Sequence, residues 1–210
     1  MSEIKVNSVV NSTGDNDSGL DLSTNDQVII KTANTTALTI NSSQVATFAQ
    51  PPVGTFISEL DQFRLTADTS NGASGDITAN LERVDDTTFS KIGTGMTENS
   101  GIYTFPSTGL YQVICNPTTI AVSDNALKVK TMISTDSGGS FGEIASTSGG
   151  GGGSSFDQNS PSTSVYINVT NASTFRIKFQ LGSVGVSSRL VGSTTSTHTN
   201  FVFIKLGESQ

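Results

Sequence analysis

The side chains that could carry out chemistry are few and widely spaced in this chain. Among 210 residues there is one histidine, His198, and one cysteine, Cys115. No Ser-His-Asp order or nucleophile-elbow motif accompanies His198, so a catalytic triad would lack an oriented base. Cys115 ends the apolar run 112–115, which predicts a small core residue and not a reactive thiol. We therefore expect a protein that is not an enzyme and needs no cofactor.

Two acidic pairs, Asp85-Asp86 and Asp15-Asn16-Asp17, are the candidates for carboxylate chemistry. Neighbouring residues of a strand point to opposite faces, whereas the two carboxyls of a glycosidase must face each other across a sugar. Such adjacent pairs are therefore unsuited to that role. Both segments offer oxygen ligands for calcium, but neither forms an EF-hand loop. We interpret them as solvated acidic turns, keep a calcium site at Asp85/Asp86 as the alternative, and predict no metal.

A glycine run, Gly149–Gly153, falls within a predicted loop over residues 134–162. No Gly-Lys-Ser/Thr follows it, so it is not a phosphate-binding loop. Long loops on a rigid scaffold often carry binding function. The run is therefore interpreted either as a flexible tip or as an adaptable contact loop anchored by Phe141 and Phe156. Residues 68–76 and 182–197, the latter with Arg189, are the other candidate binding loops.

Charge and targeting patterns exclude several classes of partner. The net charge is −7, and the eleven basic residues are scattered, which disfavours binding to a nucleic-acid backbone. No apolar stretch of about 20 residues is present, so no membrane insertion is expected. The N-terminus has no basic region followed by an apolar core, so no secretory signal is expected.

The composition that must position these residues is typical of an all-β protein. Only 34% of the chain is hydrophobic and 14% is charged, because Ser, Thr, Asn and Gly make up much of the rest. Apolar residues alternate at period two in many short segments, as strands require. So few hydrophobic residues predict a thin core for a chain of this length, which favours an oligomer in which each chain packs against its neighbours. Strands are predicted over 62–68, 78–84, 87–92, 101–105, 110–122, 126–135, 163–170, 174–181 and 199–206.

The segment Gly101–Tyr111 gives the clearest local signal. It predicts a hairpin with a first strand that ends at Pro106, a turn through Gly109 and a second strand from Leu110. A second turn, over residues 171–173, is expected to join the strands on either side of it. The last strand, Phe201–Leu206, is nearly continuously apolar, which predicts burial on both faces, one within the sandwich and the other against a neighbouring subunit.

The chain divides near Gln50-Pro51-Pro52-Val53-Gly54, where two prolines favour a short stiff joint. Residues 1–53 carry brief alternating apolar pairs, such as Val9/Val10 and Leu38/Ile40, and they bury too little to fold alone. We interpret residues 1–53 as an attachment and trimerisation segment, and residues 54–210 as a head.

The head resembles C1q- and TNF-like domains. Gly101-Ile-Tyr-Thr-Phe-Pro-x-x-Gly-Leu-Tyr111 is similar to a G-x-F/Y-x-x-P-x-x-G-x-Y segment of that family, and 198–204 is similar to its closing strand. Thr87–Phe89 stands where the family has an early strand, and Val169 with 174–177 where it has a late hairpin. The resemblance covers about residues 62–207 and implies a homotrimer of jelly-roll β-sandwiches. It also makes four aromatic residues candidates for the core or the trimer axis: Phe105, Tyr111, Phe201 and Phe203.

The N-terminal segment carries a second resemblance. Ile4–Asn7, Thr32–Ile40 and Val45–Phe48 look like the leading region of fibre proteins of marine tailed bacteriophages. In those proteins this region is associated with joining the fibre to the particle. The likeness implies attachment to capsid or tail proteins through residues 1–53.

Together these features predict a structural virion protein of a tailed bacteriophage. It would be a trimeric fibre or appendage, made in the host cytoplasm, whose head attaches to a host-surface receptor such as a glycan. The first alternative is a capsid-decorating protein that coats or stabilises the shell. A cellular C1q/TNF-like signalling or adhesion ligand is a third interpretation.

Overall fold

The computed structural model describes residues 8–10, 19–23, 27–33, 35–50, 57–151, 156–182 and 184–210. The predicted joint at Gln50–Gly54 therefore lies largely outside the described residues, as do Asp15–Asp17 and Ile4–Asn7. The chain forms two compact units, Met1–Phe56 and Ile57–Gln210, and we call the second one the head. Across the described ranges the regular structure is β-sheet, and no helix there is long and apolar enough to cross a membrane.

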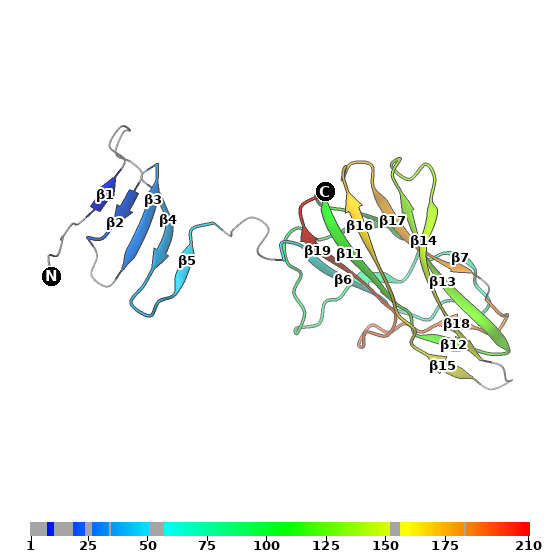
Figure 1. Ribbon diagram of the computed structural model, residues 1–210. Helices are drawn as coiled ribbons and strands as arrows, with labels where there is room; N and C mark the ends of the chain where they lie inside the picture. Colours follow the sequence, from blue (N-terminus) through cyan, green and yellow to red (C-terminus); the bar gives the residue numbers. More distant parts are fainter. Residues whose placement is uncertain are drawn as a thin grey trace. The chain divides into compact units, whose positions relative to one another are not determined.

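The first unit contains one antiparallel sheet whose strands follow the order of the sequence (Figure 1). Period-two alternation, seen in Val28–Thr32 and Thr35–Ile40, gives each strand one apolar and one polar side. The strands are β1 (Ser8–Val10), β2 (Gly19–Asp21), β3 (Val28–Thr32), β4 (Thr35–Ile40) and β5 (Ala46–Phe48).

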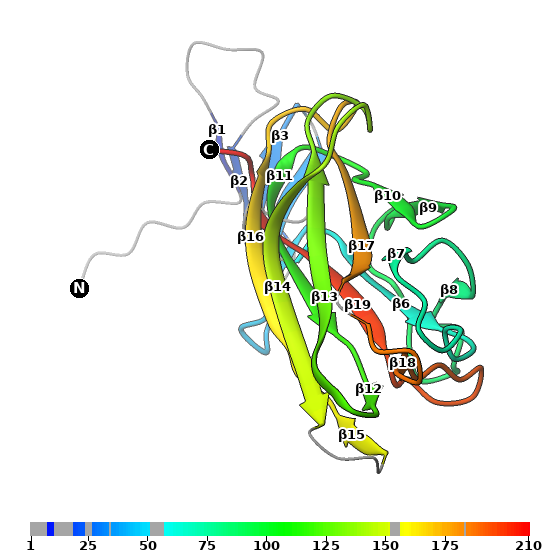
Figure 2. The same cartoon turned by 90° about the vertical axis from the view of Figure 1, so that its right-hand side faces the viewer.

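The head is a sandwich of two sheets with a small third sheet at one end (Figures 1 and 2). The first sheet has the order β14 (Gly142–Gly151), β13 (Asp124–Ser134), β17 (Arg176–Gly182), β10 (Ile102–Thr104) and β9 (Thr97–Asn99), with β7 (Gly75–Asp76) also beside β17. The second sheet has the order β16 (Thr163–Val169), β11 (Gly109–Asn116), β19 (Asn200–Gly207), β6 (Leu60–Leu65) and β8 (Leu81–Arg83). The small sheet has the order β15 (Asp157–Asn159), β12 (Thr119–Ala121) and β18 (Arg189–Leu190).

The core lies between the two large sheets and is built from alternate residues of their strands. β11, β17 and β19 bury every second side chain over most of their length. The rings of Phe179 and Phe201 stack with centroids 3.9 Å apart, and Tyr103 packs against Phe63 at 5.0 Å. Such aromatic pairs add to the large apolar area that these residues bury. The predicted all-β sandwich is thus observed.

The predicted hairpin over Gly101–Tyr111 is wrong in its pairing. β10 pairs with β9 and β17, whereas β11 pairs with β16 and β19, so the segment between them crosses from one sheet to the other. Phe105 and Tyr111 both point into the core, with ring centroids 4.9 Å apart. A crossing lets the chain place both rings between the sheets.

The true hairpin at this point joins β9 to β10 and was not predicted. Its turn consists of Ser100 and Gly101, whose φ angles are 51° and 83°. Two successive positive φ values characterise the tight turns whose twist matches that of paired strands. A Cβ on Gly101 would also meet the carbonyl oxygen of Ile77, so both conformation and space require glycine.

Other strand predictions also need correction. The turn over 171–173 joins β16 to β17, which lie in different sheets, so it too is a crossing. Residues 87–92 form no strand, and the predicted 134–162 loop contains two strands, β14 and β15. Within one chain the last strand, β19, buries only one face: Phe201 and Phe203 are buried, while Val202 and Ile204 on its other face are partly exposed.

Candidate functional site

The strand register defines two ends of the head. In β19, Gly207 pairs with Leu110 and Ile204 pairs with Leu60, so the start of β6 and the end of β19 lie together. We call this the root end. At the other end Asn200 pairs with Arg64, and the small sheet β15–β12–β18 continues the strands there. Figures 1 and 2 show this sheet at the end of the head away from the C-terminus, and we call it the tip.

The tip brings together two of the predicted binding residues, Phe156 and Arg189. β12 pairs on one side with β15, which follows Phe156, and on the other with β18, which begins at Arg189. The Arg189 guanidinium lies 5.8 Å from the centroid of the Phe156 ring, within the range of a cation–π contact. Phe156 is 70% exposed, so the ring presents an open apolar surface.

Asp68 holds the guanidinium in place. Arg189 Nε donates a hydrogen bond to Asp68 Oδ2 at 2.8 Å, and the Gly192 amide donates to Oδ1 at 3.0 Å. Partial burial favours a higher pKa for Asp68, but these two hydrogen bonds and the Arg189 charge outweigh it and leave the pKa below its usual value. We call Phe156, Arg189 and Asp68 the tip platform. It offers an aromatic surface beside an ionised acid–base pair.

Phe141 does not join this platform, contrary to the interpretation of 134–162 as one contact loop. Phe141 directly precedes β14, which runs for ten residues to Gly151. Gly142, the first residue of β14, pairs with Ile133 at the root end, where the turn over 171–173 also lies. Ten strand residues span about 33 Å, so Phe141 and Phe156 belong to opposite ends of the head. Phe141 instead covers Lys178, whose Nζ lies 4.2 Å from its ring centroid.

The glycine run is a packed strand where the structure describes it. Gly149 and Gly151 belong to β14, while residues 152–155 lie outside the described residues. A Cβ on Gly149 would lie 2.6 Å from Thr119 Oγ1, and one on Gly151 would lie 2.7 Å from Asp157 Cβ. The glycines therefore allow β12 and β15 to approach β14 closely, which is a known use of glycine in strands.

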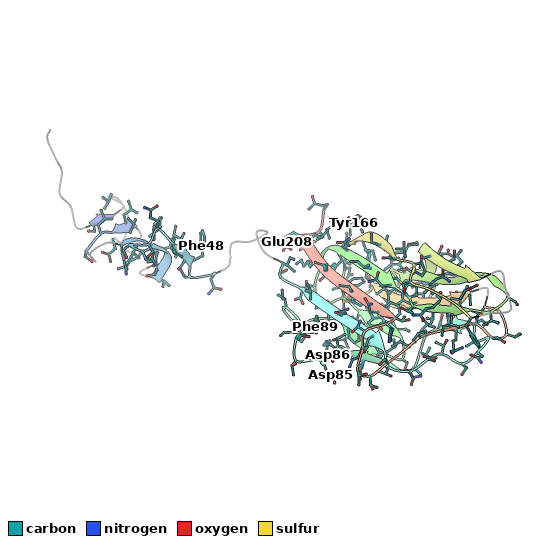
Figure 3. All side chains as sticks on the ribbon, turned by 90° about the horizontal axis from the view of Figure 1, so that it is seen from below. Phe48, Asp85, Asp86, Phe89, Tyr166 and Glu208 are labelled. Atoms are coloured by element: carbon teal, nitrogen blue, oxygen red, sulfur yellow. The ribbon has the colours of Figure 1, made fainter. Side chains whose placement is uncertain are left out.

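Both carboxylates of the acidic pair Asp85-Asp86 form ion pairs with one arginine, Arg64. Arg64, which is 1% exposed, donates from Nη2 to Asp85 at 2.7 Å and from Nη1 to Asp86 at 2.9 Å. Its Nε donates to Glu82 at 2.7 Å. Figure 3 shows Asp85 and Asp86 at the same edge of the head. The residues follow β8 and are not in a strand, so they do not diverge to opposite faces as adjacent strand residues would, nor are they simply solvated.

This arginine explains the local charge balance better than a metal does. The hydrogen bond to Glu82 is the main cause of a raised pKa for Arg64, with burial opposing it and Asp86 reinforcing it. Within the described residues no group of three or more His, Cys, Asp or Glu side chains is arranged so that it could hold a metal ion. The carboxylates proposed as the calcium alternative therefore serve to neutralise a buried cation.

The remaining chemically capable groups are dispersed. His198 is exposed at the tip, and Cys115 lies in the core, where burial raises the pKa of its thiol. An open cleft of about 410 Å³ is lined by Glu82, Arg83 and Glu98 among others. Its charged groups are engaged in structure: Glu98 accepts from the Gly101 amide at 2.7 Å, and Arg83 donates to Asp61. The described residues thus bring together no oriented nucleophile and base.

The outer face of the second sheet is a feature that the sequence indicated only in its last strand. Paired residues of neighbouring strands share a face, and Ile114 pairs with Val202 while Gln112 pairs with both Tyr166 and Ile204. The outward residues of β16, β11 and β19 carry no charge, whereas Arg64 and Glu82 stand at the β6–β8 edge of the same face, and Tyr166 is 62% exposed. We call this the uncharged face: Leu60, Gln62, Leu110, Gln112, Ile114, Tyr166, Val202 and Ile204. The signal was present in the sequence, because the outward positions of β11 and β19 include the apolar residues Leu110, Ile114, Val202 and Ile204.

The four aromatic residues predicted for the core or the trimer axis all lie inside one chain. Phe105, Tyr111, Phe201 and Phe203 are each at most 2% exposed. Tyr111 keeps a polar partner there, since its hydroxyl donates to the Ser107 carbonyl oxygen at 3.1 Å. They pack the sandwich and present no surface to another subunit.

No family model and no curated protein sequence matches the chain. Solved structures do match in fold. Eiger TNF from S. frugiperda matches with 13% identity and a TM-score of 0.54, over 74% of this chain and 96% of that one. Murine APRIL matches with 15% identity and a TM-score of 0.46, over 70% and 98% of the two chains. PRD1 vertex protein P5 matches with 16% identity and a TM-score of 0.41, over 72% and 99%. At these identities the likeness concerns fold alone, and the match to Eiger TNF confirms a TNF-like jelly roll.

Proposed function

We propose that this protein is a structural component of a tailed-bacteriophage particle, a homotrimeric fibre or appendage whose head attaches to glycans of the host surface. The observation that carries the proposal is the position of the tip platform. The exposed ring of Phe156 and the partly exposed Arg189 lie together at the end of the head opposite the one where the chain enters it. A fibre presents such an end to its receptor.

The chemistry of the tip platform suits a saccharide. A sugar ring can lay its apolar face on the Phe156 ring, while its hydroxyls exchange hydrogen bonds with the Arg189 guanidinium and the Asp68 carboxylate. A site of three side chains binds weakly by itself. Three linked heads multiply such weak binding through effective concentration, which is why we couple the adhesion proposal to a homotrimer.

The uncharged face supports the trimer part of the proposal. A contiguous uncharged surface on the outer side of a sheet needs a partner that brings no unpaired charge, and a second copy of the same face meets that need. The first unit, including residues 1–53, would then join the trimer to capsid or tail proteins. The segments Ile4–Asn7, Thr32–Ile40 and Val45–Phe48, which resemble phage fibre proteins, support that role.

The test uses the full chain on an array of bacterial surface polysaccharides. We expect wild type to bind at least one glycan, and Phe156→Ala or Arg189→Ala to weaken that binding by about tenfold or more, which corresponds to about 1.4 kcal/mol. Phe141→Ala is the matched control, since Phe141 also covers a cation but lies at the root end. Equal losses for Phe141→Ala and Phe156→Ala would argue against the tip platform.

Antibody labelling of intact particles separates the two virion roles. Label on fibres or tail, with loss of adsorption when the protein is removed, is the expected result. Label spread over the capsid shell, with normal adsorption of particles that lack the protein, would favour the decoration role instead.

A further inference from the structure

One face of the first unit's sheet is apolar across all five strands. The register pairs Val9 with Leu20, Leu20 with Ile30, Ile30 with Leu38, and Leu38 with Phe48. Directly paired residues of antiparallel strands point to the same side, so these five side chains form one continuous row. A second pair, Val28 and Ile40, stands two residues away on the same side. We call these seven residues the apolar stripe.

The opposite face has a different character. It carries a row of Asp21, Ile29, Thr39 and Thr47, and the Lys31 ammonium pairs with Asp21 at 2.6 Å. The apolar stripe contains no charged residue, whereas this face contains an ion pair typical of a solvated surface. The face with Asp21 and Lys31 is therefore suited to contact with solvent, and the face with the apolar stripe is suited to burial.

Nothing within the described part of this unit covers the apolar stripe. Its members are between 36% and 52% exposed, apart from Leu38, which is partly buried. Five strands spaced about 4.8 Å apart and three to six residues long give a face of about 300 Å². A sheet with one apolar face needs a second layer to be stable, and an uncovered patch of this size marks an interface.

We propose that the apolar stripes of three identical chains pack against one another around a common axis and form a trimeric β-stem. The inference rests on the homotrimer of the proposed function and names the surface that continues it into the first unit. Three such faces together amount to about 900 Å², which is below the roughly 1,000 Å² of a specific interface, so the stem depends on the head trimer that links its three chains.

Identical copies fit the stripe for two reasons. The stripe is uncharged, so its own copies bring no unpaired charge into contact, although each chain carries a net charge of −7. Three heads joined through the uncharged face would also hold three stripes at high effective concentration, which offsets the small area of each. The face with Asp21 and Lys31 stays on the outside of the stem, where it is free to contact the particle.

The absence of tryptophan from the chain permits a direct optical test. Phe48→Trp places a fluorophore in the stripe, and Thr47→Trp places one on the opposite face of the same strand, β5 (Figure 3 labels Phe48). In the full-length trimer we expect blue-shifted emission from Phe48→Trp and solvent-like emission from Thr47→Trp. We expect the double variant Phe48→Trp/Ile30→Lys to lose the blue shift, because Ile30 lies in the stripe. The control Phe48→Trp/Ile29→Lys should keep the shift, because Ile29 lies on the opposite face of the same strand.

Sedimentation of the same variants separates this inference from the trimer itself. A trimeric chain in which both tryptophan variants show solvent-like emission overturns the stem and leaves the head trimer standing. A monomeric chain with solvent-like emission overturns both. A monomeric chain with blue-shifted Phe48→Trp emission also overturns the stem, because a surface of the same chain then covers the stripe.

Discussion

Arg64 is the charged side chain of the head with the most complete set of partners. Each of its guanidinium nitrogens donates to a carboxylate, and Nη2 also donates to the carbonyl of Thr194. These contacts tie β6 to the segment after β8 and to the loop before β19. A position of this kind has no sequence motif, because its partners are separated by 18 to 130 residues.

We expect Arg64→Met to lower the free energy of unfolding by about 3 kcal/mol, the lower end for a broken buried ion pair, because the three carboxylates are partly exposed. Urea unfolding measures the change. Arg189→Met is the control and should cost less than about 1 kcal/mol, since its pair with Asp68 lies at the surface. Equal small effects for the two variants would mean that the carboxylates need no cation.

At the scale of elements, β14 shows how glycine can build a strand and not a loop. Gly149 and Gly151 allow close packing of β12 and β15, whereas Gly142 on the same strand has open space at its Cβ position. Composition alone favours a loop for such a run. The close neighbours that require glycine come from strands distant in sequence, so the local pattern carries no sign of them.

This difference predicts opposite effects for one substitution at two positions of β14. Gly149→Val should destabilise the head by about 1–3 kcal/mol, because its side chain would overlap Thr119 and Asn159. Gly142→Val should be neutral or slightly stabilising, since it fills open space with a strand-favouring residue. The midpoints of thermal unfolding of both variants, compared with wild type, test this prediction. A destabilised Gly142→Val would show that any side chain disturbs this strand.

At the scale of the whole molecule, two uncharged sheet faces call for partners: the apolar stripe of the first unit and the uncharged face of the head. For the head we expect Tyr166→Glu to shift the chain from trimer towards monomer in sedimentation velocity, because the added charge would be buried at the interface.

The control for this change is Val186→Glu, which alters a side chain that is 89% exposed near the tip and outside the uncharged face. It should leave the assembly trimeric. Dissociation by both variants would point to a general effect of negative charge on this acidic chain, and dissociation by neither would place the trimer contact on another surface of the head.

The sequence by itself determined the all-β class, the alternation that directs Phe105, Tyr111, Phe201 and Phe203 inwards, and the scarcity of catalytic groups. These properties are local, since a period of two or a missing residue type is visible within a few positions. It also marked Phe156 and Arg189 as separate loop residues.

Only the tertiary structure decided which strands pair and which residues meet. It turned the apparent hairpin after Gly101 into a crossing between sheets, joined Phe156 to Arg189, and gave Asp85 and Asp86 a shared arginine. The physical reason is that a turn and its flanking strands look alike whether the strands pair with each other or with distant ones. The choice depends on how the two sheets together bury the most apolar surface, and that is a property of the whole chain.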